Sequence, residues 1–116
     1  MVTPRRGEIW WADLGEPRGS EPGYLRPVLI VQNNSFNRSN LATVIVLALT
    51  TNQKHATMPG NILLPGEQTG LAKNSVLSIT QLSAIDKAWL TERVGQLPAY
   101  VLSEVERSLK LLLDLA

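Results

Sequence analysis

The stretch from Arg26 to Asn34 limits the fold more than any other part of the chain. It reads Arg-Pro-Val-Leu-Ile-Val-Gln-Asn-Asn, so four consecutive apolar residues follow a proline. The residue before a proline prefers an extended backbone, and an unbroken run of Val, Leu and Ile is typical of a strand buried on both faces. We therefore predict a buried strand that carries the cation of Arg26 at its entrance and ends at the asparagines.

Strand patterns recur on both sides of this segment. Residues 8–14 predict a first strand, and residues 43–50 repeat the buried pattern with polar residues only at the ends. Weaker short or alternating patterns predict further strands at residues 61–64, 74–82 and 92–97. In the segment 74–82 we expect one face on the core and one polar face that carries Ser78 and Thr80.

The C-terminal segment has the clearest helical pattern. Pro98 suits a first helical turn, and the apolar residues after it recur on one helical face: Val101, Leu102, Val105, Leu109, Leu112 and Leu113. Residues 84–90 predict a turn with a short helical piece. Strands without βαβ alternation, followed by one amphipathic helix, predict a mainly β fold: a small antiparallel barrel or curled sheet with a helical appendage. A chain of 116 residues, 44% of them hydrophobic, suffices for one domain over residues 1–116.

Composition excludes several classes of function. Eleven Lys and Arg residues stand against ten Asp and Glu, so any nucleic-acid site must be local rather than a basic surface. The chain has no cysteine and one histidine, which argues against disulfides and protein metal sites. The N-terminal residues lack the apolar run of a secretion signal, and no apolar segment approaches the roughly 20 residues that span a bilayer. We therefore expect a soluble, cytoplasmic protein without metal or cofactor.

The remaining candidates for chemistry are Arg26 and the polar groups at strand ends or in two long loops, residues 15–25 and 51–60. These groups are Ser20, Glu21, Thr50, Thr80 and Gln81. If they converge at one rim of a barrel, they suit an RNA phosphodiester, because attack by the adjacent 2′-hydroxyl needs no external nucleophile and no metal. Arginine would stabilise the charge that develops on the phosphate. The alternative is that Arg26 only pairs with Glu21 or Asp13, that Thr50 only ends its strand, and that Glu21 is only solvated. A Ser-His-Asp triad would need His55, but the neighbouring residues supply no carboxylate to orient it, so we expect a solvated loop histidine.

Five blocks of the chain, in order, resemble those of the MazF/PemK toxins. They are Arg-Gly-Glu-Ile-Trp-Trp-Ala-Asp-Leu from residue 6, Gly-Ser-Glu from 19, Arg-Pro-Val-Leu-Ile-Val-Gln-Asn from 26, the strand 43–50, and residues 74–87. The resemblance implies a bacterial toxin of a type II toxin–antitoxin pair, with an SH3-like barrel and a C-terminal helix. It further implies a metal-independent endoribonuclease that cuts single-stranded RNA at short sequences, leaves a 2′,3′-cyclic phosphate and a 5′-hydroxyl, and so inhibits translation.

The same resemblance implies partners. Members are homodimers, and the disordered C-terminal tail of a MazE-like antitoxin covers the RNA groove at the dimer interface. Leu111 and Leu115 lie outside the main apolar face of the predicted helix and would be costly to expose on a monomer.

Residue roles follow from the matching blocks. In the MazF branch the Arg of the Arg-Pro-Val block and the Thr that closes the next long strand form the catalytic pair, which here are Arg26 and Thr50. The PemK/Kid branch instead uses an Arg and an Asp on the later strand and a His in the first loop, where this chain has Ser78, Thr80 and Ser20. We assign Glu21 as a hypothetical acceptor of the 2′-proton. The predicted RNA-binding residues are Ser20, Asn33, Thr51, Ser78, Thr80 and Gln81.

Two other functions stay open at this point. A CcdB-like toxin would bind gyrase, but the C-terminal Trp-Gly-Ile of such proteins is replaced by Asp114-Leu115-Ala116. An SH3-like interaction module would bind a peptide in a groove formed by Trp10, Trp11 and Tyr24. Many family members read Gln where this chain has Pro22, so base selection is expected to differ from theirs.

Overall fold

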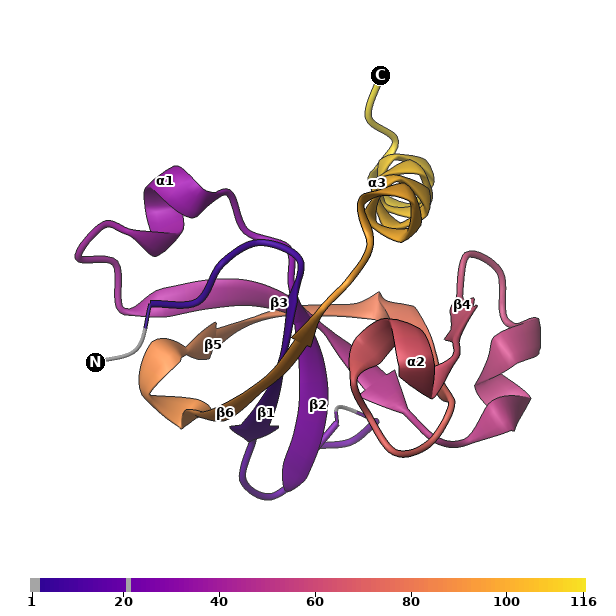
Figure 1. Ribbon diagram of the computed structural model, residues 1–116, viewed down its shortest axis with the longest axis horizontal. Helices are drawn as coiled ribbons and strands as arrows, with labels where there is room; N and C mark the ends of the chain where they lie inside the picture. The colour runs from indigo at the N-terminus through magenta and orange to yellow at the C-terminus, as the bar shows by residue number, and fades with distance from the viewer. Residues whose placement is uncertain (1–2, 21) are drawn as a thin grey trace.

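The computed structural model describes residues 3–20 and 22–116, which form one curled antiparallel sheet of six strands with three α-helices around it (Figure 1). The strand order is β4-β5-β3-β2-β1-β6. The strands are β1 (Glu8–Asp13), β2 (Leu25–Ile30), β3 (Thr43–Thr50), β4 (Ile62–Leu64), β5 (Ser75–Asp86) and β6 (Leu90–Gln96). The helices are α1 (Asn34–Asn37), α2 (Gly66–Thr69) and α3 (Ala99–Leu113), with 3₁₀ turns η1 (Gln53–Thr57) and η2 (Lys87–Trp89).

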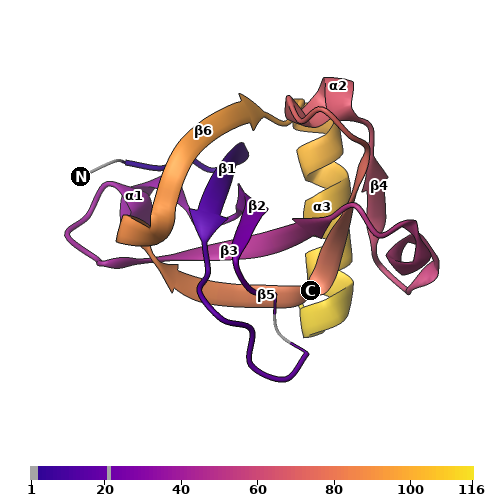
Figure 2. The same cartoon turned by 90° about the horizontal axis from the view of Figure 1, so that it is seen from below.

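The sheet curls into an open barrel, and α3 lies along its β5 side (Figure 2). The predicted mainly β fold with a C-terminal amphipathic helix is thereby confirmed. Within the described ranges, no helix is long and apolar enough to cross a membrane.

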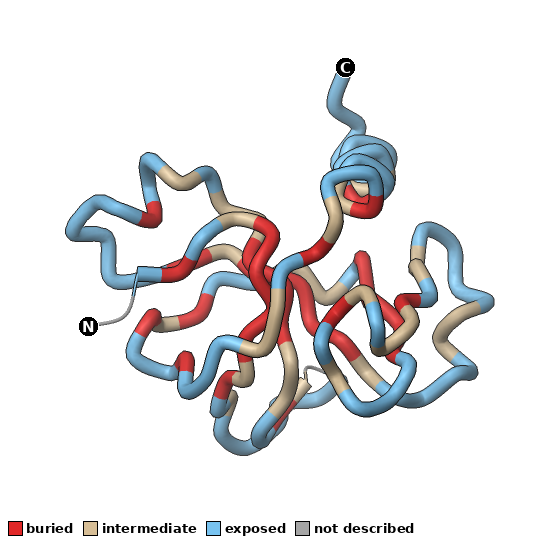
Figure 3. Tube along the Cα trace, in the orientation of Figure 1, coloured by how far each residue is buried: buried red, intermediate tan, exposed pale blue. Residues whose placement is uncertain are grey.

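Each face of the sheet carries its own hydrophobic core. Leu29 and Leu47 point into a helix-side core that α3 closes with Val101 and Val105. Alternate residues of the same strands, such as Val28, enter a second core on the opposite face. Figure 3 shows the buried segments concentrated along these strands. This double burial is what the unbroken apolar runs of β2 and β3 predict.

The prediction for residues 84–90 is wrong in its first half. Residues 84–86 continue β5, where Ile85 pairs with Val44 and Asp86 with Thr43. Only Lys87–Trp89 is helical. The buried Ile85 side chain joins the second core, so tertiary packing overrides the weak local pattern.

The expected polar face of β5 is also wrong over part of its length. Every residue from Ser75 to Ile79 is buried, including Ser78, and exposure begins at Thr80. Leu47 pairs with Leu82 and Leu49 with Leu77, so β5 carries extra residues opposite Ala48. This bulge separates residues 82–86 of β5, which pair with β3, from residues 76 and 77, which pair with both β3 and β4.

A buried lysine shapes the loop between β2 and β3. Lys87 is 2% exposed, and its Nζ donates hydrogen bonds to the carbonyl oxygens of Asn37 at 2.9 Å and Ser39 at 3.3 Å. Both carbonyls lie at or just after the C-terminal end of α1, where a cation is favourable. The ammonium is therefore held by backbone oxygens.

A close backbone approach fixes α2 against β6. A Cβ atom on Gly95 would collide with the carbonyl oxygen of Thr69, and one on Gly70 would lie 2.8 Å from that of Val94. Gly70, with φ of +87°, also ends α2 in the left-handed conformation. The chain then runs through residues 71–73 into β5, so this approach sets the path of that segment.

We predict that Gly95→Ala lowers the free energy of unfolding by about 1–3 kcal/mol, because the added methyl group overpacks a backbone contact that has no room to yield. Urea-induced unfolding measures the change. Glu92→Ala, at an exposed position of the same strand, is the control and should stay within about 0.5 kcal/mol of the parent protein. Equal stabilities of the two variants would contradict the packing argument.

Candidate functional site

The pairing of β2 with β3 brings Arg26 and Thr50 together. Val28 pairs with Ala48 and Ile30 with Val46. One further step of the same antiparallel register places Arg26 opposite Thr50, with both side chains on the same face of the sheet. Both residues lie where the strands reach the rim, and both line one pocket of about 660 Å³, which we call the Arg26 pocket.

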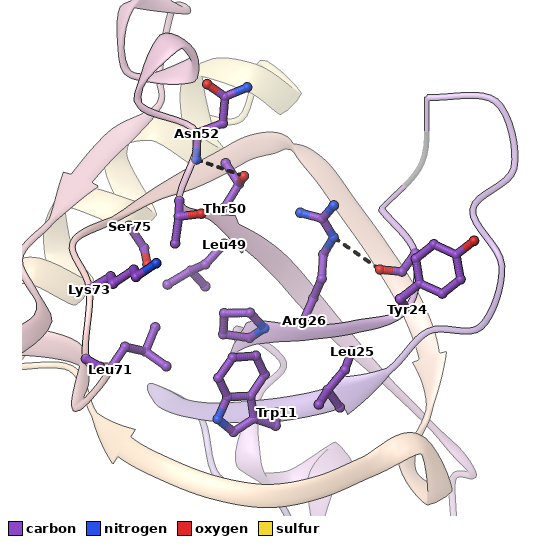
Figure 4. A pocket seen from close by; sticks show the side chains of 14 residues that line it. Trp11, Tyr24, Leu25, Arg26, Leu49, Thr50, Asn52, Leu71, Lys73 and Ser75 are labelled. Carbon is purple, nitrogen blue, oxygen red and sulfur yellow. Dashed lines mark hydrogen bonds between the residues drawn. The ribbon is translucent and has the colours of Figure 1, made fainter.

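The walls of the Arg26 pocket come from four segments. Trp11 of β1 and Arg26 of β2 form one side, and the end of β3 with residues 51 and 52 forms another. Leu71 and Lys73, which follow α2, complete the wall. Figure 4 shows the guanidinium of Arg26 extending into the pocket on the same side as Thr50.

Arg26 is half-buried and oriented by the backbone. Its Nε donates a hydrogen bond to the carbonyl oxygen of Gly23 at 3.2 Å, which leaves the terminal nitrogens facing the pocket. Within residues 3–20 and 22–116 the ion pairs are Arg6 with Glu106 and Arg93 with Glu8. The predicted alternative pairing of Arg26 with Asp13 is absent from them, and the carboxylate of Asp13 instead accepts from the backbone N–H of Gly15.

Thr50 presents its hydroxyl from the last position of β3. Its Oγ1 accepts a hydrogen bond from the backbone N–H of Asn52 at 3.2 Å and keeps its own proton available for donation. Thr51 lies directly after the strand, is exposed, and lines the same pocket. The register argument favours Thr50 as the partner of Arg26.

The described lining of the Arg26 pocket contains two cations, Arg26 and Lys73, and neither a carboxylate nor an imidazole. Such a pocket favours an anion and stabilises charge that develops on it. Among the residues that the structure describes, no group of three His, Asp or Glu side chains is placed to hold a metal ion. Glu21, the predicted proton acceptor, lies outside the described residues.

Other predicted residues occupy different places. Thr80 and Gln81 line a second pocket of about 860 Å³ between the β1–β2 loop and β5, which we call the Trp89 pocket. Ser78 is buried within β5. Ser20 is exposed in the β1–β2 loop and lines neither of these two pockets.

Asn33 lies at the opposite end of β2 from Arg26, and the structure does not bring it to either pocket. Its side-chain oxygen accepts from the backbone N–H and the hydroxyl of Ser35, both at 2.8 Å, and so caps α1. An asparagine that follows a strand can cap a helix as readily as it can bind a ligand, and Asn33 caps α1.

Sequence reasoning missed several residues of the Arg26 pocket. Lys73 and Asn52 stand in loops without a motif, and the path of the backbone alone brings them here. Trp11, expected only in a peptide groove, lines this pocket. Trp10 is 7% exposed, and its indole N–H donates to the carboxylate of Glu8 at 3.1 Å. The predicted peptide groove of Trp10, Trp11 and Tyr24 is therefore wrong, because Trp10 belongs to the second core.

Comparison with known proteins places the chain in one family. The family model of PemK-like, MazF-like toxins of type II toxin–antitoxin systems matches residues 5–113. The chain is 48% identical to endoribonuclease MazF6 of Mycobacterium tuberculosis over 110 residues, 95% of this chain and 96% of that protein. It is 34% identical to endoribonuclease EndoA of Bacillus subtilis over 111 residues, 96% and 95% of the two chains. A mycobacterial endoribonuclease solved in complex with its cognate antitoxin has a TM-score of 0.77 at 26% identity and covers 100% of this chain and 98% of its own. The chain therefore belongs to the PemK-like, MazF-like toxin family of type II toxin–antitoxin systems.

Proposed function

We propose that this chain is the toxin of a toxin–antitoxin pair and cleaves single-stranded RNA in the Arg26 pocket. It is an endoribonuclease of the MazF family, as its relatives in Mycobacterium tuberculosis and Bacillus subtilis are. The observation that carries the proposal is the opposed placement of Arg26 and Thr50 in a pocket whose described lining holds two cations. Neither the gyrase-binding toxin nor the inert interaction module is favoured by these relatives.

The proposed reaction uses the RNA as its own nucleophile. The 2′-oxygen attacks the adjacent phosphorus, the bond to the 5′-oxygen breaks, and the products are a 2′,3′-cyclic phosphate and a 5′-hydroxyl. Arg26 binds the non-bridging phosphate oxygens through its planar fork and stabilises the charge of the transition state. Thr50 donates its hydroxyl to the same phosphate. Glu21 accepts the 2′-proton, and the departing oxygen takes a proton from water.

RNA would extend from the Arg26 pocket toward the Trp89 pocket. Thr80 and Gln81 offer hydroxyl and amide groups for unpaired bases there. Thr51 and Ser20 are exposed near the proposed path of the RNA, whereas Ser78 and Asn33 are less suited to direct contact, because Ser78 is buried and the side-chain oxygen of Asn33 caps α1. The recognition sequence would depend on these polar groups.

We further propose a homodimer in the cytoplasm that a MazE-like antitoxin inhibits by laying its C-terminal tail over the RNA groove. The mycobacterial structure with a bound antitoxin supports this partner class. Leu111 at the end of α3 is 78% exposed in the single chain, and Leu115 follows it on the surface. Burial of these leucines against a second copy would remove a large apolar patch from water.

We expect Arg26→Ala to reduce kcat/KM for a single-stranded RNA by roughly 100- to 1000-fold, the usual loss when one donor to a developing oxyanion is removed. Arg26→Lys should recover only part of it, since an ammonium lacks the planar fork. Cleavage is measured with EDTA present. The control is Arg38→Ala, an exposed arginine beyond the far end of β2. Full activity of Arg26→Ala would refute the assignment.

Lys73 should contribute a phosphate contact rather than chemistry. We expect Lys73→Ala to raise KM and to leave kcat within about threefold. The slope of log binding constant against log salt concentration should become shallower by about 0.7, the value for one phosphate contact on a single strand. Binding titrations over a range of salt concentrations check this. Lys110→Ala, on the exposed side of α3, should leave the slope unchanged. Equal slopes for Lys73→Ala and the parent would show that Lys73 contacts no phosphate.

Glu21→Gln tests the proton acceptor. The amide keeps the size of the side chain but accepts no proton, so we expect kcat to fall by roughly 100-fold or more while RNA binding persists. Single-turnover cleavage and binding to a 2′-deoxy analogue separate the two effects. Retained full activity of Glu21→Gln would exclude Glu21 as the base.

A further inference from the structure

Tyr24 has a backbone conformation that its side chain disfavours. Within residues 3–20 and 22–116, two residues other than glycine have a positive φ: Tyr24 at 58° and Asp114 at 55°. For Asp114 the reason is local, because it ends α3 and its N–H bonds to the carbonyl of Leu111. Tyr24 ends no helix, and the left-handed conformation costs a residue with a Cβ atom about 1–2 kcal/mol. Such strain persists only where surrounding contacts enforce it, often at ligand sites.

The surrounding contacts at Tyr24 are well defined. The N–H of Leu14 donates to the carbonyl oxygen of Tyr24 at 2.8 Å, and the N–H of Tyr24 donates to the carbonyl oxygen of Gly15. The preceding residue, Gly23, lies so close to Pro17 that a Cβ there would collide with it. These contacts extend the β1–β2 pairing beyond Asp13 and Leu25 and lock the base of the loop.

The outcome of this geometry is an aromatic ring presented to solvent beside the catalytic cation. Tyr24 is 64% exposed and lines the Arg26 pocket. The carbonyl oxygen of its neighbour Gly23 is the acceptor that orients Arg26. Figure 4 shows the ring at the edge of the pocket, next to Arg26. The strain therefore stabilises nothing in the core and instead places an unburied aromatic face two residues before Arg26, the group that binds the phosphate.

An exposed aromatic beside a phosphate-binding cation suits a nucleotide. Unpaired bases stack on tyrosine rings in single-stranded complexes, and the gain is tolerant of base identity because every base has a π-face. We propose that Tyr24 is a stacking platform for an unpaired base that neighbours the scissile phosphate. This inference rests on the proposed cleavage of RNA, and it adds a residue that holds the substrate in register with Arg26 and Thr50.

Three substitutions separate stacking from structure. Tyr24→Phe keeps the ring, Tyr24→Leu keeps an apolar side chain without a π-face, and Tyr24→Gly removes the ring and relieves the backbone strain. The matched control is Phe36→Leu, which replaces another exposed aromatic, on α1 at the far end of β2. The probe is an RNA that spans the mapped cut site, with a 2′-deoxy nucleotide at the cut and 2-aminopurine beside it, whose fluorescence falls on stacking.

We expect Tyr24→Leu and Tyr24→Gly to raise KM, and Kd for the probe, by roughly 5- to 100-fold, with kcat within about threefold. Fluorescence quenching should be lost in both variants. Tyr24→Phe and Phe36→Leu should match the parent protein. Tyr24→Gly should unfold at the same or a higher urea concentration than the parent, because glycine adopts the positive φ without cost. Weaker RNA binding in an equally stable variant is a result that a merely structural tyrosine would not give.

Two outcomes would overturn the proposal. One is a KM for Tyr24→Gly within twofold of the parent value with unchanged quenching. The other is a loss in Tyr24→Phe as large as that in Tyr24→Gly, which would assign the effect to the hydroxyl. Failure of the underlying function looks different: the parent protein would cleave no RNA but would still bind single-stranded RNAs that carry 2-aminopurine and quench their fluorescence, and stacking would then stand without the nuclease.

Discussion

The pairing register of β2 with β3 is the constraint on which the candidate site depends. Leu29 and Leu47 face the helix-side core, while Val28 and Val46 face the second core, so both sides of the pairing are buried. A slip of one strand by one residue would move each of its apolar side chains into the core on the opposite face, where the packing does not fit it. The same register aligns Arg26 with Thr50. The energy that fixes the positions of Arg26 and Thr50 therefore comes from the hydrophobic cores, and the rim residues themselves need not contribute to it.

The sequence predicts best where one interaction dominates. The bounds of β3 follow from its unbroken apolar run, and α3 begins directly after Pro98 as its amphipathic pattern indicates. Arg26 and Thr50 share a pocket, as the family resemblance implies. The extension of β5 through Ile85 was not predictable from local pattern, because its pairing with β3 joins residues some forty positions apart in the chain. Lys73 was missed for the same reason, since the approach of α2 to β6 determines where it lies.

The Arg26 pocket and the Trp89 pocket differ in how rigid their walls are. Arg26 and Thr50 stand at the ends of strands whose central residues are buried, so the backbone holds both residues in fixed positions. Thr80 and Gln81 stand on the bulged part of β5 and face the β1–β2 loop. Loops vary in length and sequence more readily than strands. Changes in the β1–β2 loop can therefore reshape the Trp89 pocket while Arg26 and Thr50 keep their positions.

The buried Lys87 affects how far the sequence of the loop between β2 and β3 can change in this fold. Its buried ammonium binds the carbonyl oxygens of Asn37 and Ser39, which every amino acid possesses, rather than their side chains. The neighbouring Arg38 and Asn40 are exposed. Lys87, which is distant in the chain, thus fixes the backbone path of the loop between β2 and β3. It constrains the identity of the exposed side chains in that loop very little. Sequence drift in the loop after β2 is therefore compatible with an unchanged backbone, as long as the lysine after β5 is retained.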